Sequence, residues 1–149
     1  MKPTPYGLVQ AAEQVKAAGK HELVVLSREL EQVALSDPPP LMVATLQDHR
    51  YVTPRTREIY RRLAQAGTHV TLHARGLHGW LDPGVQGVDL TEDDPLVHEW
   101  VVVVPSRVRP AVLAATDLDG ASVDDDARSF SYAVSYDPQL VAACAALLT

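Results

Sequence analysis

The chain has 149 residues, a formal net charge of −6 and 46% hydrophobic residues. This length fits one domain, and the apolar content excludes wholesale disorder. Direct binding to nucleic acid or to a membrane surface is not expected, because both need clustered basic residues and these gather only around residues 50–62.

The first half of the chain predicts two helices and then a β-α-β unit. Apolar residues recur at helical spacing over residues 6–18 and 23–35, and the proline run at 38–40 prevents continuation of the second helix. The apolar run 41–46 predicts a buried strand. Thr53 and Pro54 are typical of a helix start, so we expect a third helix that ends at Gly67.

Alternating apolar residues over 69–75 predict a strand with one buried face. Residues 76–95 are rich in Gly, Pro and Asp, which predicts a loop with a short extended piece at 85–90. The β-branched run 100–104 predicts a central strand with residues 111–116 as its antiparallel neighbour, and residues 130–135 predict a further strand.

A final helix is predicted to begin at Pro138 with Asp137 as its cap. Cys144, the only cysteine, lies in this apolar helix and is expected to be an inert buried thiol. A chain that cannot form an internal disulfide suits the cytoplasm, and no signal peptide or membrane span is visible.

These elements predict an α/β fold, with α+β as the variant. We expect a single domain over residues 1–149 built on one mixed β-sheet flanked by helices. The sheet is expected to be parallel in its first half and antiparallel in its second half.

Four segments resemble the DICT domain, a family named for its occurrence in diguanylate cyclases and two-component systems. The most specific segment is Asp94–Val103, with its Asp-Pro-Leu-x-x-Glu-Trp pattern. The others are residues 23–31, residues 40–47 with His49-Arg50-Tyr51, and residues 130–137. The resemblance covers residues 20–149 and leaves residues 1–19 as an N-terminal helix.

The resemblance implies a bacterial sensory domain, usually attached to an output module such as a histidine kinase, a nucleotide cyclase or a DNA-binding domain. The chain contains no such module, so we expect either signalling in trans to a regulatory partner or an excised domain. The resemblance implies no catalytic residue, and the cofactor is unknown.

Gln47, His49, Arg50 and Tyr51 are candidate ligand-binding residues. They follow a predicted parallel strand, and ligands of open α/β sheets bind beyond the carboxyl ends of strands. Their donors, acceptors and aromatic ring suit a small polar or aromatic molecule. The alternative is a solvated loop whose polar groups cap the next helix.

Glu99 and Trp100 form a second candidate pair. Trp100 would wall a pocket that Glu99 polarises, and Glu99 would pair with Arg50, Arg55 or Arg28. The alternative is a strand-edge carboxylate beside a core tryptophan.

Trp80 follows a Gly-rich segment and is either an anchor beneath the loop or a contact for a partner protein. No metal site is predicted. His69 and His73 share a strand face, where we expect them to be solvated, and match no zinc spacing. The acidic segment Asp117–Gly120 lacks the first acid of a calcium loop.

Three functions remain open. The chain is a non-enzymatic sensory module that binds a small ligand, a ligand-free interaction module that forms a homodimer, or an enzyme with an acid–base site at His49, Arg50 and Glu99. An acid–base site needs those groups within hydrogen-bond reach. The absence of a nucleophile elbow and of a phosphate-binding glycine loop favours the first two functions.

Overall fold

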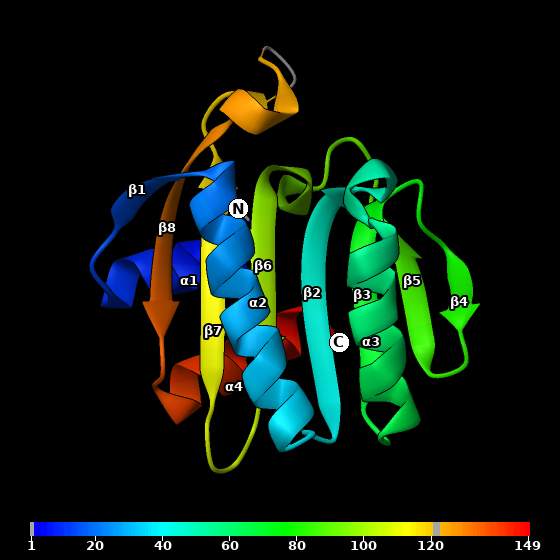
Figure 1. The fold of residues 1–149 in the computed structure, drawn as a ribbon. Helices are drawn as coiled ribbons and strands as arrows, with labels where there is room; N and C mark the ends of the chain where they lie inside the picture. Colours follow the sequence, from blue (N-terminus) through cyan, green and yellow to red (C-terminus); the bar gives the residue numbers. More distant parts are fainter. Residues whose placement is uncertain (1, 121–122) are drawn as a thin grey trace.

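The computed structural model describes residues 2–120 and 123–149, and its strands form one mixed sheet (Figure 1). The strands are β1 (Lys16–Gly19), β2 (Leu41–Asp48), β3 (His69–Arg75), β4 (Gly79–Asp82), β5 (Val85–Asp89), β6 (Glu99–Val104), β7 (Ala111–Asp117) and β8 (Ser129–Ser135). Their order across the sheet is β1-β8-β7-β6-β2-β3-β5-β4. β2, β3 and β5 are parallel, and β6, β7 and β8 are antiparallel, which confirms the predicted mixed sheet.

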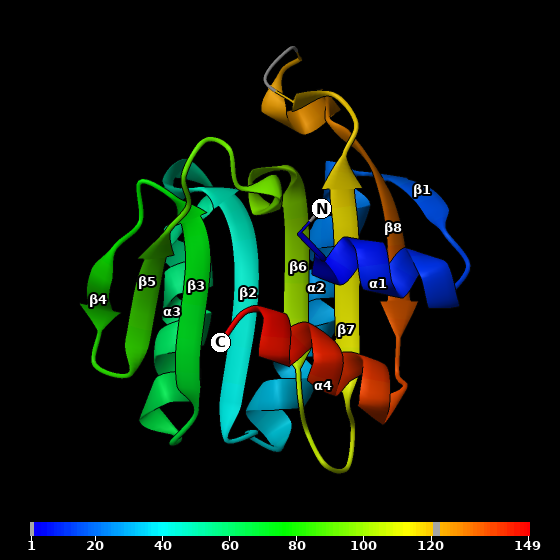
Figure 2. The ribbon, with the colours of Figure 1, turned by 180° about the vertical axis from the view of Figure 1, so that it is seen from behind.

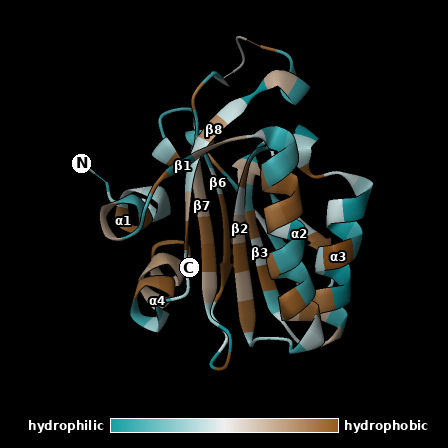
Figure 3. Cartoon of the chain, turned by 60° about the vertical axis from the view of Figure 1, so that its left-hand side comes forward, coloured by the Kyte–Doolittle hydropathy of each residue, from teal (hydrophilic) through white to brown (hydrophobic). Residues whose placement is uncertain are grey.

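The helices cover both faces of the sheet. α2 (Lys20–Ser36) and α3 (Pro54–Gln65) lie on one face, and α1 (Pro5–Ala12) and α4 (Pro138–Leu147) lie on the other (Figures 1 and 2). The sheet is therefore an apolar layer between two pairs of helices (Figure 3). Along β6, Val102 joins the core under α2 while Val101 and Val103 join the core under α1 and α4, as alternation along a strand requires.

Local start signals correctly located two helices. The Thr53 side chain accepts a hydrogen bond from the Thr56 N–H at the start of α3, and the Asp137 side chain accepts one from the Gln139 N–H at the start of α4. A proline occupies the first turn of each helix. An N–H at that position would have no acceptor within the helix, so the proline costs no hydrogen bond there. No helix among the described residues is both long and apolar enough to cross a membrane.

Two segments differ from the prediction. The first helix ends at Ala12 rather than at residue 18, because Lys16–Gly19 pairs with β8 as an antiparallel edge strand. This pairing satisfies backbone groups of β8, a gain that outweighs the weak helical pattern of the alanines. The segment predicted as a loop contains β4, which returns through a turn at Gly84 (φ 83°) to pair with β5.

Cys144 is fully buried on α4, as predicted. Burial, with a smaller contribution from Glu99, raises the pKa of its thiol from 9.0 to about 11. Because the thiolate is the nucleophile, we expect the folded protein to leave a disulfide reagent such as DTNB unreacted at pH 8. Unfolding in urea should release the full equivalent of thiol. A folded-state rate equal to that of free glutathione would contradict this prediction.

Candidate functional site

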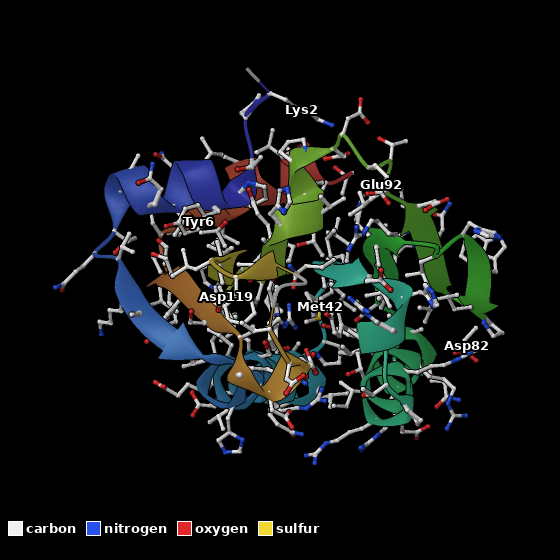
Figure 4. The ribbon with its side chains drawn as sticks, turned by 90° about the horizontal axis from the view of Figure 1, so that it is seen from above. Lys2, Tyr6, Met42, Asp82, Glu92 and Asp119 are labelled. Carbon is white, nitrogen blue, oxygen red and sulfur yellow. The ribbon has the colours of Figure 1, made fainter. Side chains whose placement is uncertain are left out.

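A cavity of about 140 Å³ lies under α2 at the carboxyl end of β2. Its apolar walls come from Val24 of α2, Leu46 of β2, and Trp100 and Val102 of β6. The other lining residues are polar or aromatic: Lys20, Ser27, Arg28, Glu31, Gln47, Arg50, Tyr51, Thr53, Thr56, Asp125 and Arg128. Figure 4 looks onto this end of the sheet, where ligands of open α/β sheets bind.

Gln47 is the centre of a buried hydrogen-bond network. Its amide nitrogen donates to the Val97 carbonyl at 3.4 Å and to Asp117 Oδ2 at 3.2 Å, and its Oε1 accepts from Arg128 Nη1 at 2.9 Å. The residue lies at an irregularity in β2 and has a φ of 69°, a conformation that costs a non-glycine residue about 1–3 kcal/mol. The three hydrogen bonds offset this strain.

Arg128 closes one side of the network. Its Nη1 lies 3.1 Å from Asp117 Oδ2, and both side chains are almost fully buried. Its Nε donates to Asp125 Oδ1 at 2.9 Å. The guanidinium carbon lies 4.3 Å from the ring centre of Tyr51 and 5.0 Å from that of Phe130. Arg128 therefore ties the loop before β8 to the end of β7 and to the residues after β2.

The Asp117 carboxylate is stabilised in its charged form. Burial opposes its ionisation, but the N–H groups of Asp119 and Gly120 and the side chains of Gln47 and Arg128 donate to it. The donors outweigh the burial and lower the pKa of Asp117. Asp117 and Arg128 are therefore a charged pair at the base of the site.

Three residues that line the cavity each carry a buried polar atom that has no hydrogen-bond partner among residues 2–120 and 123–149: Ser27 Oγ, Arg28 Nε and Trp100 Nε1. Arg28 uses its other nitrogens, with Nη1 2.8 Å from Glu31 Oε1 and Nη2 3.2 Å from Thr56 Oγ1. A buried donor without a partner costs about 1–3 kcal/mol, and native proteins contain few of them. Three such atoms on residues that line one cavity make this cavity the strongest candidate for a binding site.

The lining carries more positive than negative charge. Its four cations are Lys20, Arg28, Arg50 and Arg128, whereas its two anions are Glu31 and Asp125. Asp117 behind Arg128 and Asp48 beside Arg50 are further anions, so each of the four cations lies within ion-pair distance of a carboxylate. The Arg50 side chain is 57% exposed, and its Nε lies 3.9 Å from Asp48 Oδ1. The lining residues by themselves are therefore cationic, but each of their cations is paired, and Arg50 has the weakest pair.

Four of the six candidate ligand-binding residues line this cavity: Gln47, Arg50, Tyr51 and Trp100. His49 is not among the lining residues, because its exposed side chain turns away and its ring lies over Gly76. Gln47 also differs from the solvated loop residue of the alternative interpretation, since its side chain is buried in the network.

Glu99 lies on the opposite face of the sheet from Trp100. Its carboxylate accepts the Tyr6 N–H of α1 at 3.0 Å, and burial raises its pKa. The expected pocket shared by Glu99 and Trp100 is therefore wrong: adjacent residues of a strand point to opposite faces.

The expected ion pairs of Glu99 are wrong as well. In the described part of the chain Glu99 bonds to the α1 backbone rather than to Arg50 or Arg55, and Arg28 pairs with Glu31 instead. The acid–base cluster of His49, Arg50 and Glu99 is not assembled, because Arg50 lies under α2 and Glu99 under α1.

The histidines and Trp80 lie away from the cavity. His73 is buried, not solvated as expected, because the end of α4 covers it and its Nε2 lies 2.9 Å from the Leu148 carbonyl. Trp80 is 65% exposed on β4, and its ring contacts the His69 ring in a T-shaped arrangement, so it is not a buried anchor beneath the loop. Over residues 2–120 and 123–149, no three His, Cys, Asp or Glu side chains gather as metal ligands.

Sequence reasoning missed Lys20, Ser27, Arg28 and Arg128. A signal for Ser27 existed, because it falls on the stripe of Leu23, Leu30 and Ala34 that α2 buries. A polar residue on a buried helix stripe needs a partner or a ligand. Arg128 has no comparable local signal, since it lies in a polar loop.

Comparisons with known proteins bear on the fold and the family. The family model DICT, described as "Sensory domain in DIguanylate Cyclases and Two-component system", matches residues 7–118. No curated protein matches the chain.

Two solved structures share the fold. TrmBL2, an archaeal chromatin protein with a novel mode of DNA binding, has 11% identity and a TM-score of 0.53 over 89% of this chain and 49% of its own. Polyphosphate kinase from Porphyromonas gingivalis has 13% identity and a TM-score of 0.53 over 93% of this chain and 23% of its own. This chain thus spans half or less of each, and at these identities the likeness shows the fold alone.

Proposed function

Because the chain belongs to the DICT family of sensory domains, we propose that it is a signal-input module that binds a small molecule in the cavity under α2. It then signals in trans to a regulatory or output protein. One observation carries this proposal: three residues that line one cavity each carry a buried polar atom with no partner in the described part of the chain. A pocket with apolar walls and a few convergent polar groups is the usual form of a small-molecule site.

The lining elements suggest how occupancy changes the molecule. Lys20 at the start of α2 pairs with Asp125, which also bonds to Arg128. The cavity thus contacts α2, the turn at His49–Tyr51, and the loop before β8 at once. A ligand that binds one packing of these elements more tightly than another shifts their equilibrium by that difference in affinity. The partner protein would recognise the favoured packing. The location of the protein in the cytoplasm stays a prediction.

Native mass spectrometry of freshly purified protein tests the proposal. We expect a fraction of the chain to carry one extra small mass that denaturation releases, because a buried site retains its ligand during purification. The same spectrum reports whether the chain forms a homodimer. A spectrum of the bare polypeptide, together with a lysate extract that leaves the melting temperature unchanged, would contradict ligand binding.

A further inference from the structure

The cavity under α2 also indicates the chemistry of its occupant. We propose that the ligand is a small monocarboxylate with an apolar body, whose carboxylate meets Ser27, Arg28 and Trp100. This inference rests on the proposed function, since it assigns the ligand class for the same cavity. It follows from three properties of the wall: the type of the unpartnered atoms, the weak pairing of Arg50 and the apolar surface.

The unpartnered atoms require a hydrogen-bond acceptor. The indole Nε1–H of Trp100 and the Nε–H of Arg28 can only donate, and the Ser27 hydroxyl can donate as well. An ammonium group has no lone pair to offer, so it would leave these donors unmet. A carboxylate accepts through two oxygens, and its hydrogen bonds are strengthened by its charge.

The charge of the wall favours a monoanion. Arg28 and Glu31 neutralise one another, as do Lys20 and Asp125 and the buried pair formed by Arg128 and Asp117. Arg50 is the most weakly paired cation of the wall, because its side chain is 57% exposed and its Nε lies 3.9 Å from Asp48 Oδ1, a carboxylate that Arg75 shares. A carboxylate of charge −1 can pair with Arg50, whereas a phosphate monoester at about −1.5 to −2 needs more positive charge than this wall offers.

The size and the remaining surface favour a short apolar body. Val24, Leu46 and Val102 give the cavity apolar wall surface beside its polar groups. An apolar cavity of about 150 Å³ in another protein holds one benzene ring, and this one measures about 140 Å³. A single ring or a chain of about six carbons therefore fits with the carboxylate at the donors.

The test titrates the protein with benzoate and hexanoate, with the neutral benzamide and hexanamide, and with benzylammonium and hexylammonium. The readout is the indole N–H resonance of Trp100 in NMR, and exposed Trp80 on β4 is the internal reference. We expect at least one carboxylate to shift the Trp100 signal and to bind about tenfold more tightly than its amide, because it accepts charge-assisted hydrogen bonds. The ammonium compounds should leave the signal unchanged.

Ser27→Ala and Ser36→Ala form a matched pair on α2. The Ser27 hydroxyl is buried without a partner, so its removal should raise the melting temperature of the ligand-free protein by roughly 2–4 °C and weaken carboxylate binding about tenfold. Ser36 is exposed, and its hydroxyl donates to the Val33 carbonyl at 2.8 Å. Ser36→Ala should leave binding unchanged and should not raise the melting temperature.

Amides or ammonium compounds that bind as tightly as the carboxylates would overturn the carboxylate assignment. The same holds if none of the six probes moves the Trp100 signal. A neutral or cationic compound recovered in native mass spectrometry would also overturn it while supporting ligand binding. Only the absence of any retained or responsive compound contradicts both proposals.

Discussion

Replacing Arg128 by leucine is expected to lower the free energy of unfolding by about 3–5 kcal/mol. The substitution would leave the Asp117 carboxylate buried and charged without the cation that stabilises it. The Gln47 carbonyl would lose a donor at the same time, and the strained backbone at Gln47 would lose one of the contacts that hold it. Urea unfolding followed by circular dichroism measures the change.

Arg61→Leu is the control for this substitution. Arg61 lies exposed on α3 and pairs with Glu58 on the same helix, an arrangement worth little in water. Its loss should leave the free energy of unfolding almost unchanged. If Arg128→Leu lowers the free energy of unfolding no more than Arg61→Leu does, the buried network does not stabilise this end of the sheet.

The effect of Arg128→Leu should depend on pH. Because the pKa of Asp117 is lowered in the folded protein, its contribution is present above the unfolded pKa of about 3.9 and is lost as pH falls through the folded pKa. The variant lacks the guanidinium that helps to lower that pKa. The difference in stability between wild type and variant should therefore be largest at pH 7 and should narrow toward pH 3. An equal difference at both values would exclude charge pairing as its cause.

Val24→Phe is expected to weaken ligand binding by about 100-fold or more, because the phenyl ring occupies the space that the apolar part of a ligand needs. Val25→Phe is the matched control. Val25 is the next residue on α2, and its side chain is 47% exposed, so the same change there leaves the cavity open. Both variants should fold, with Val24→Phe destabilised by overpacking of about 1–3 kcal/mol at most.

Two readouts check this prediction. Native mass spectrometry should show the retained small molecule in the wild type and in Val25→Phe but not in Val24→Phe. A chemical-shift titration with benzoate should give the same order at the Trp100 indole. Equal retention by Val24→Phe and Val25→Phe would show that the molecule binds outside the cavity.

The prediction succeeded for features that neighbouring residues determine. Thr53 with Pro54, and Asp137 with Pro138, indicate helix starts because each cap is made within three residues. The apolar run of β6 and the alternation of β3 indicate strands for the same reason. The prediction failed for residues 16–19, where a partner strand more than 100 residues away decides between helix and strand.

Four of the six candidate ligand-binding residues line one cavity, because three lie at or just after the end of β2 and the fourth lies on its neighbour β6. Leu46 of β2 lies opposite Trp100 of β6, so the residues after β2 and the start of β6 share one end of the sheet. The placement of Glu99 was wrong although alternation along the strand already separates it from Trp100.

The sequence by itself determined the family, the mixed sheet and the polar segment after β2, because these depend on local patterns and their order along the chain. Only the tertiary structure decided which charged and polar side chains pair with one another. Arg128 reaches Gln47 across 81 positions of sequence, and Lys20 reaches Asp125 across 105. No local pattern encodes such contacts, since they arise only when the sheet brings the start of α2 and the loop before β8 to the same cavity.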